Sequence, residues 1–190
     1  EKIVEDRDAN AEEAKITLVN AGTMAARMPF LFDLLDKVDA NNAQSEIYLT
    51  DIVGIAHSLN CSIACQVADG DEVMGVNSRA DLAQAEALLQ IELRAAAMAS
   101  GVTLHAPDTV FLSADSVIER DVIIEPHVVI GSECHIGEGS VIKAFSHIEG
   151  AKLGACCVIG PYARLRPGTT AAEGVKIGNF VETKNVSLDK

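Results

Sequence analysis

The sequence contains no tryptophan, and only 4% of its 190 residues are aromatic, although 48% are hydrophobic. Its core must therefore be built from closely layered aliphatic side chains rather than from large rings. Basic residues are also scarce, because 15 Lys and Arg stand against 28 Asp and Glu, a formal net charge of -13. This balance argues against general nucleic-acid binding and against attraction to anionic membranes, and it is typical of a solvated acidic surface.

Long apolar runs and paired cysteine motifs are missing too. No run is long enough to cross a bilayer, and no secretory signal is recognisable, so we expect no membrane insertion and a cytoplasmic location. The chain lacks an initiator Met and ends inside a repeat, so we interpret it as an internal piece of a longer protein. The odd number of cysteines, without a CxxC pair, favours reduced thiols that act as small core residues. They are Cys61, Cys65, Cys134, Cys156 and Cys157.

The first part of the sequence shows mixed α/β patterning. Residues 16–22 and 61–68 are rich in β-branched and apolar residues between turn formers, and we expect strands there. Residues 29–38 and 50–59 have helical patterns, with Thr50 as the expected N-cap of the second helix. Two strands and two short helices cannot close a core, so this part is expected to belong to a larger α/β domain.

A long helix is predicted to follow, starting at Ser78. Ser78 and Asp81 have the spacing of a capping box, and Gly101 is placed to end the helix as a left-handed cap. Apolar residues recur between them at helical spacing, which predicts one buried face. They are Leu82, Ala85, Leu89, Leu93 and Ala96.

After Val102 the hydrophobic period changes to six residues, which is the signature of a hexapeptide β-helix with three faces and 18 residues per coil. The inward positions are Ile118, Ile124, Ile130, Ile136, Ile142 and Ile148, then, after a step of five, Leu153, Ile159, Leu165, Ala171 and Ile177. We interpret the step of five as a tightened corner without function. Glycines that follow the aliphatic position are expected to relieve corners with unusual φ. They are Gly131, Gly137, Gly154, Gly160 and Gly178.

Two cations lie one coil apart in this repeat. Arg166 and Lys184 are 18 residues apart and each follows an inward position, so they are expected side by side on neighbouring strands. Two adjacent cations in an acidic protein favour a bound phosphate or carboxylate. The alternative is that each is a separate solvated side chain, relieved by Glu182 or Glu173. Arg164 and Glu182 are also 18 apart and predict a modest surface pair.

Other candidate residues carry less information. Glu5, Asn20 and Asn77 lie at predicted strand ends or loops, where α/β proteins bind ligands, but each also suits a turn or cap. The sequence shows no Gly-rich phosphate loop, no HExxH and no Ser/His/Asp order. The histidines of the repeat lack the convergent spacing that a zinc site needs.

Six motifs, in this order along the chain, resemble bacterial bifunctional N-acetylglucosamine-1-phosphate uridyltransferase / glucosamine-1-phosphate acetyltransferase. They are "IVEDRDA", "LVNAG", "NNAQSEIYLTDIV", "EVMGVNSR", "IGPYARLRPG" and "IGNFVETKN". The resemblance implies three parts: the C-terminal portion of a Rossmann-like uridyltransferase domain over 1–77, a linker helix over 78–101, and the N-terminal portion of a left-handed β-helix acetyltransferase domain over 102–190. It also implies a homotrimer formed through the β-helix.

The resemblance further implies roles for five residues. Glu5, Asn20 and Asn77 resemble residues that contact UDP-N-acetylglucosamine, and Asn77 also resembles a ligand of Mg²⁺. Arg166 and Lys184 resemble the residues that bind the amino-sugar phosphate in the acetyltransferase site.

The implied activity belongs to the longer protein. It would acetylate glucosamine-1-phosphate with acetyl-CoA, then transfer uridylyl from UTP to N-acetylglucosamine-1-phosphate, supplying UDP-N-acetylglucosamine for cell-wall and lipopolysaccharide precursors. The nucleotide loop would precede residue 1, and the acetyl-transfer base would follow Lys190. We therefore expect no catalytic residue here and an inactive segment. Two alternatives stay open: a sugar-1-phosphate nucleotidyltransferase whose β-helix is only a scaffold, and a non-enzymatic trimerisation module.

Overall fold

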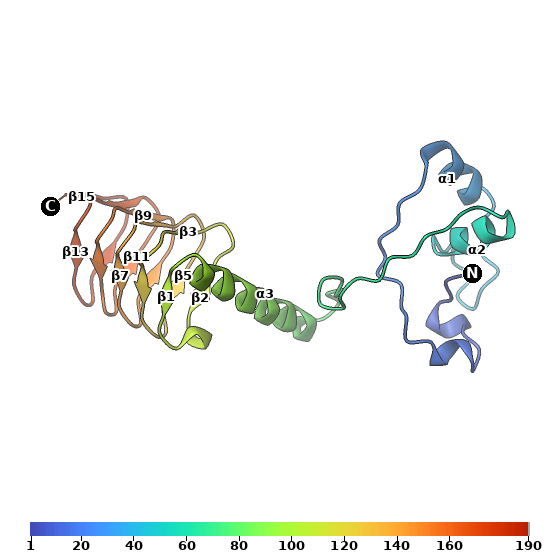
Figure 1. Ribbon diagram of the computed structural model, residues 1–190, viewed down its shortest axis with the longest axis horizontal. Coiled ribbons are helices and arrows are strands. Elements are labelled where there is room, and N and C mark those ends of the chain that lie inside the picture. Colours follow the sequence, from blue (N-terminus) through green and yellow to red (C-terminus); the bar gives the residue numbers. More distant parts are fainter. Residues whose placement is uncertain (190) are drawn as a thin grey trace. The chain divides into compact units, whose positions relative to one another are not determined.

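The computed structural model describes residues 1–189, and the chain forms two compact units, Glu1–Gly75 (unit 1) and Val76–Lys190 (unit 2) (Figure 1). Unit 1 has two short 3-10 turns and two helices. These are η1 (Asp6–Asp8), η2 (Glu13–Lys15), α1 (Met28–Leu35) and α2 (Asp51–Ser58). Both expected helices are confirmed, and they pack around buried Leu34, Ile52 and Ala56. No helix among residues 1–189 has the length and hydropathy needed to span a membrane.

The strands expected at 16–22 and 61–68 are wrong, because both segments are irregular. Val19 is 80% exposed, and Ile16 and Leu18 are exposed as well. A β-branched segment becomes a strand only where a neighbour completes its hydrogen-bond ladder and covers one face. The described residues of unit 1 provide no such neighbour, so they contain no sheet and do not display a Rossmann-like fold.

Unit 2 begins with α3 (Arg79–Ala99), whose ends are set as the sequence predicts. Ser78 Oγ accepts a hydrogen bond from the Asp81 N–H at 3.1 Å, and the Asp81 carboxylate accepts from the Ser78 N–H at 2.8 Å. The hydrogen bond from the Asn77 N–H lowers the pKa of Asp81 most, and the two bonds with Ser78 lower it further. Gly101, with φ +98°, ends the helix. The capping box and the left-handed cap are therefore confirmed.

The rest of unit 2 is a parallel β-helix with three sheets of five strands, and the 3-10 turn η3 (Pro107–Thr109) lies within its first coil (Figure 1). Sheet A contains β1 (Thr103–Leu104), β4 (Ile123–Ile124), β7 (Val141–Ile142), β10 (Val158–Ile159) and β13 (Lys176–Ile177). Sheet B contains β2 (Phe111–Leu112), β5 (Val129–Ile130), β8 (His147–Ile148), β11 (Arg164–Leu165) and β14 (Glu182–Thr183). Sheet C contains β3 (Val117–Ile118), β6 (His135–Ile136), β9 (Ala151–Leu153), β12 (Thr169–Ala171) and β15 (Ser187–Leu188).

The six-residue period fills the interior of this β-helix, as predicted. The inward aliphatic side chains from Ile124 to Leu165 are at most 1% exposed, and successive coils stack in register. Fully burying each such side chain contributes about 1.5–3 kcal/mol. The coil that contains the step of five is one residue shorter, since Val141 pairs with Val158. Cys134 and Cys157 fill small interior positions as expected, whereas Cys65 and Cys156 are exposed.

The predicted role of the repeat glycines is wrong except at Gly160, because the other four do not have positive φ. The left-handed corner lies two or three residues beyond the inward position and is mostly not glycine. Its residues are Asp121, His127, Glu133, Gly139, Phe145, Gly150, Cys156, Tyr162, Gly168, Gly174, Phe180 and Asn185. Gly137 and Gly154 are needed for close approach instead: a Cβ on Gly137 would lie 2.5 Å from the Gly154 carbonyl carbon.

One corner carries an aromatic ladder that the histidine spacing alone did not predict. His127, Phe145, Tyr162 and Phe180 stack with ring centroids 4.9, 5.0 and 5.2 Å apart. These rings come one from each of four successive coils, at the corner between sheets A and B. A spacing of one aromatic or histidine ring per coil was the sequence signal for it.

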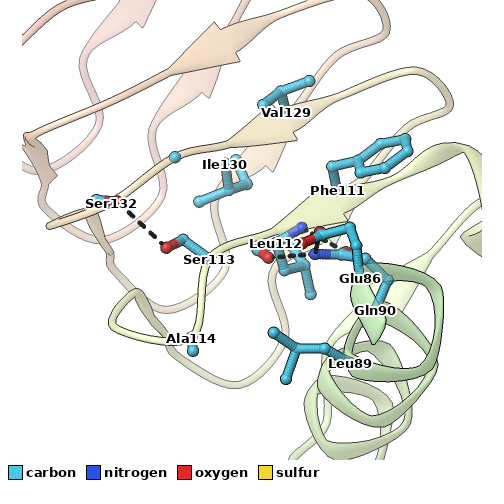
Figure 2. Close-up of a pocket in the computed structure, with 11 residues that line it drawn as sticks. Glu86, Leu89, Gln90, Phe111, Leu112, Ser113, Ala114, Val129, Ile130 and Ser132 are labelled. Atoms are coloured by element: carbon cyan, nitrogen blue, oxygen red, sulfur yellow. Dashed lines mark hydrogen bonds between the residues drawn. The ribbon is translucent and has the colours of Figure 1, made fainter. Parts of the chain in front are cut away.

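The first coil is closed mainly by polar side chains of α3, although Leu93 of the predicted apolar series packs against the core. Leu82 is 59% exposed, whereas Gln90 and Arg94 are only 4% and 9% exposed. Gln90 Nε2 donates to the Leu112 carbonyl at 2.7 Å, and the Leu112 N–H donates to Gln90 Oε1 at 2.9 Å (Figure 2). The side-chain amide of Gln90 thus takes the place of a neighbouring strand at the edge of β2. Arg94 donates to the Val110 carbonyl, one turn further along α3.

We predict that Gln90→Met lowers the free energy of unfolding by about 2–4 kcal/mol, because it leaves a buried N–H and a buried C=O of Leu112 without partners. Gln84→Met is the matched control, since Gln84 is exposed on the same helix. Urea unfolding monitored by circular dichroism measures both. Equal, small effects of the two substitutions would contradict the strand-replacing role of Gln90.

We also predict that Gly137→Ala destabilises unit 2 by about 2 kcal/mol or more, because the added methyl group overlaps backbone atoms of the next coil. Gly178→Ala tests the same repeat position, where a Cβ meets no atom within 4 Å. Thermal unfolding of the two variants checks this. A Gly137 variant as stable as the Gly178 variant would disprove the close-approach explanation.

Candidate functional site

The candidate site lies at the corner between sheets B and C, where β11 turns into β12. Gly168 has φ +81°, and a Cβ there would lie 2.3 Å from Asn185 Oδ1 in the next coil. In the preceding coil, a Cβ on Gly150 would lie 2.9 Å from Pro167 Cα. Gly150 belongs to the step of five, so this tightened corner packs directly against the corner that follows Arg166.

The strand register brings Arg166 and Lys184 to the same place on neighbouring coils. Leu165 of β11 pairs with Thr183 of β14, and the Arg166 N–H donates to the Thr183 carbonyl at 2.9 Å. Continuing this register by one residue places Lys184 beside Arg166. Arg166 is half-buried and Lys184 is exposed, so both cationic groups are accessible from solvent.

Arg166 has an acidic neighbour on the same two strands. Its Nη1 lies 3.1 Å from Glu182 Oε1, an exposed ion pair. The sequence predicted a pair between Arg164 and Glu182, and this is wrong: the two are register partners, but the carboxylate reaches diagonally to Arg166. Glu182, one of the expected relieving carboxylates, thus contacts Arg166, and a ligand would have to share Arg166 with it.

A second arginine of the β-helix shows a different arrangement. Arg120 and Glu138 are 18 residues apart, and their side chains form an ion pair at 3.0 Å. In this column, by which we mean side chains stacked at the same position of successive coils, opposite charges are neighbours, which stabilises adjacent strands. In the column of Arg166 the next coil presents Lys184, another cation. Like charges on adjacent strands are unfavourable unless an anion lies between them.

The charge of the β-helix also changes sign along its length. Residues 102–142 contain one arginine and seven Asp or Glu, whereas residues 143–190 contain seven Lys or Arg and four Asp or Glu. The first coils are therefore strongly negative and the last coils carry a net charge of +3, within a chain of -13. This field attracts an anion toward the coils that carry Arg166 and Lys184.

Unit 1 holds the candidates Glu5 and Asn20. Thr50 is the N-cap residue of α2, as expected, but its side chain makes no capping bond and instead donates its hydroxyl to Glu5 Oε1 at 3.1 Å. Next to it, burial raises the pKa of Asp51, helped by the charges of Asp39, Asp8 and Glu5. Asn20 Oδ1 accepts from the Gly22 N–H at 3.2 Å, as a turn residue does. The described residues show no hydrogen bond between Glu5 and Asn20.

Asn77, the third candidate, lies in unit 2 just before α3. Its N–H donates to Asp81 Oδ2 at 3.0 Å, so the nearby carboxylate is engaged in capping the helix. Mg²⁺ in proteins is held by one or two carboxylates plus water and phosphate oxygens. Residues 1–189 contain no group of three His, Cys, Asp or Glu side chains suited to a metal.

A groove of about 340 Å³ runs between α3 and the first coils of unit 2. Figure 2 shows Leu89 and Phe111 at its sides and the hydrogen bond between Ser113 and Ser132, whose Oγ atoms are 3.3 Å apart. It borders the cap formed by Gln90, and no Lys or Arg among the described residues lines it. The corner of Arg166 and Lys184 is therefore the stronger candidate site in unit 2.

Comparison with known proteins agrees with the sequence motifs. Residues 115–150 match the bacterial transferase hexapeptide family (six repeats). Over 98% of its length the chain is 52% identical to the bifunctional protein GlmU of Azorhizobium caulinodans, and over 96% it is 52% identical to that of Sphingopyxis alaskensis. GlmU of Zymomonas mobilis is 48% identical over the whole chain. The resemblance to the bifunctional uridyltransferase/acetyltransferase family is confirmed.

The match covers nearly all of this chain but less than half of each relative. The chain spans 41–42% of the length of these three GlmU proteins. Among solved structures, perosamine N-acetyltransferase from Caulobacter crescentus is 19% identical, with a TM-score of 0.37, covering 55% of this chain and 60% of that one. A structural similarity this low supports no argument about the function of the chain.

We predict that Lys184→Gln leaves the chain as stable or stabilises it by up to about 0.5 kcal/mol at low salt, because it removes one of two stacked like charges. Lys152→Gln is the control, since the register partners of Lys152 are His135 and Thr170. Urea unfolding at low and at 1 M salt measures the effect, which should vanish when charges are screened. Clear destabilisation by Lys184→Gln alone would contradict the like-charge column.

Proposed function

We propose that the corner of Arg166 and Lys184 binds the phosphate group of an amino-sugar phosphate, in the acetyl-transfer reaction of a longer GlmU-type protein. The observation that carries this proposal is the column of two cations on neighbouring coils, at the basic end of an otherwise acidic chain. The family match over nearly the whole chain supports it.

The two side chains suit a phosphate in different ways. The planar guanidinium of Arg166 can donate two parallel hydrogen bonds to phosphate oxygens, whereas Lys184 supplies a compact charge on a flexible stem. A phosphate bound between them would offset their mutual repulsion. Glu182 holds Arg166 in the ligand-free chain and would yield part of the guanidinium to the ligand.

In the proposed acetyl transfer, the neutral amine of glucosamine-1-phosphate attacks the thioester carbonyl of acetyl-CoA. The new amide bond forms as the carbon–sulfur bond breaks, CoA leaves as the thiol, and a base from the part of the longer protein after Lys190 takes the amine proton. Arg166 and Lys184 hold the phosphate and so fix where the amine lies. They act by positioning and move no proton.

The second proposed reaction joins the acetylated sugar phosphate to the uridylyl group of UTP, with pyrophosphate leaving. Here we propose that Glu5, Asn20 and Asn77 contact the UDP-sugar, and that Asn77 gives one amide oxygen to Mg²⁺ whose other ligands lie outside this chain. The ion would offset charge on the transferring phosphate. We place this protein in the cytoplasm as a homotrimer, where UDP-N-acetylglucosamine serves envelope precursors.

We predict that inorganic phosphate and glucosamine-1-phosphate raise the melting temperature of the chain in a saturable way, because they bind the folded state only. Arg166→Ala should weaken this binding about tenfold or more, through the loss of charge-assisted hydrogen bonds. Arg120→Ala is the matched control, since Arg120 has an equivalent ion pair outside the basic end. No saturable shift in the unsubstituted chain would favour the trimerisation module.

In the longer protein, Arg166→Ala should raise the KM for glucosamine-1-phosphate sharply and leave uridylyl transfer near normal. Steady-state kinetics of the two half-reactions measure this. Equal loss of both activities would refute the assignment of Arg166 to the acetyl-transfer site.

A further inference from the structure

Two threonines interrupt the aliphatic interior directly beneath the candidate anion site. Thr183 takes an inward position, because it is the register partner of the buried Leu165. Thr169 takes the small position two residues before the inward Ala171 and is 0% exposed. An apolar pair would fit the repeat, as the register partners of these two residues, Ala151 and Leu165, do one coil earlier.

The two hydroxyl groups connect the strands that carry the cations. Thr169 Oγ1 donates to the Arg166 carbonyl at 2.8 Å and lies 3.1 Å from Thr183 Oγ1, in a hydroxyl–hydroxyl hydrogen bond. Arg166 therefore has its carbonyl held by Thr169 and its N–H held by the Thr183 carbonyl. Lys184 follows Thr183 directly, so this short network reaches the backbone of both cationic residues.

The buried serine hydroxyls of the β-helix bond to backbone groups rather than to another hydroxyl. Ser140 donates to the Gly154 carbonyl and accepts from the Cys157 N–H, and Ser146 accepts from the Ala163 N–H. They satisfy backbone groups of the next coil. Within residues 1–189, Thr169 is the fully buried residue whose hydroxyl bonds another hydroxyl, and this pair lies at the cationic corner.

The hydroxyl bond matters more for β14, the strand that Lys184 directly follows, than for β11. In sheet B, β14 has β11 as its one neighbour among the described residues. Their backbone bonds include those from the Arg164 and Arg166 N–H groups to the Val181 and Thr183 carbonyls. The hydrogen bond between the hydroxyls of Thr169, at the start of β12, and Thr183 is a third connection to β14. A shift of β14 would change the distance between the two cations directly.

We propose that Thr169 and Thr183 are positioning residues, whose partly buried hydroxyl pair fixes the spacing of Arg166 and Lys184 for a phosphate group. This inference rests on the proposed anion site at that corner. Placing two bonded hydroxyls where aliphatic groups fit brings little stability, since replacing both partners of a hydrogen bond with apolar groups of the same shape is nearly neutral. The pair therefore serves the geometry of the corner more than the stability of the fold.

The test uses the double variant Thr169→Val/Thr183→Val of the full chain, with Thr169→Ser as the conservative variant that keeps the hydroxyl. Ser140→Ala is the matched control, because it removes a buried hydroxyl away from the corner. Calorimetric titration with inorganic phosphate gives the Kd, and hydrogen exchange gives the protection of the Arg166 N–H, which reports directly on the bond to β14.

We expect the double variant to melt close to the unsubstituted chain, to bind phosphate about three- to tenfold more weakly, and to exchange the Arg166 N–H faster. Thr169→Ser and Ser140→Ala should keep the phosphate Kd within about twofold. Unchanged phosphate affinity in the double variant, or the same loss in Ser140→Ala, would overturn the positioning role. If the unsubstituted chain binds no phosphate, the proposed function fails and this inference with it. If the unsubstituted chain binds phosphate and the double variant binds it equally well, the positioning role alone fails and the proposed anion site stands.

Discussion

The parallel register between successive coils of the β-helix is the constraint on which unit 2 depends. Each coil donates backbone hydrogen bonds to the next, and each inward aliphatic residue lies on its counterpart one coil away. Because the register is fixed by buried Ile and Leu, residues one coil apart in sequence become neighbours on the surface. Ion pairs, the aromatic ladder and the cationic corner all follow from this rule. The first coil needs an edge partner, and the side chain of Gln90 supplies it.

At the cationic corner, the same register works against stability. The repeat would tolerate an alternation of charge, as Arg120 and Glu138 show, yet Arg166 is followed by Lys184. Stacked like charges of this kind are unfavourable unless an anion lies between them, so the corner suits an anionic ligand better than a solvent-filled surface. The basic end of an acidic β-helix adds a field that favours anions there. These features are local, so they belong to the corner and not to the fold as a whole.

The sequence alone was sufficient where short-range chemistry or a strict period decides the structure. The capping box of Ser78, the cap at Gly101 and the stacked inward positions are of this kind. It was insufficient where the outcome depends on partners far along the chain. The segments 16–22 and 61–68 have strand-like composition but no strand to pair with. Nor could the six-residue period reveal that Glu182 would reach diagonally to Arg166, or that glycines serve close approach.

The measurement that tests the anion site most directly is a titration of the isotopically labelled chain with inorganic phosphate, followed by the backbone amide signals in nuclear magnetic resonance spectra. If Arg166 and Lys184 hold the phosphate, signals from these residues and from Gly168 shift saturably, with one common Kd, while the signal of Arg120 stays in place. Absence of a saturable shift at Arg166 and Lys184, or an equal shift at Arg120, would contradict an anion site at this corner.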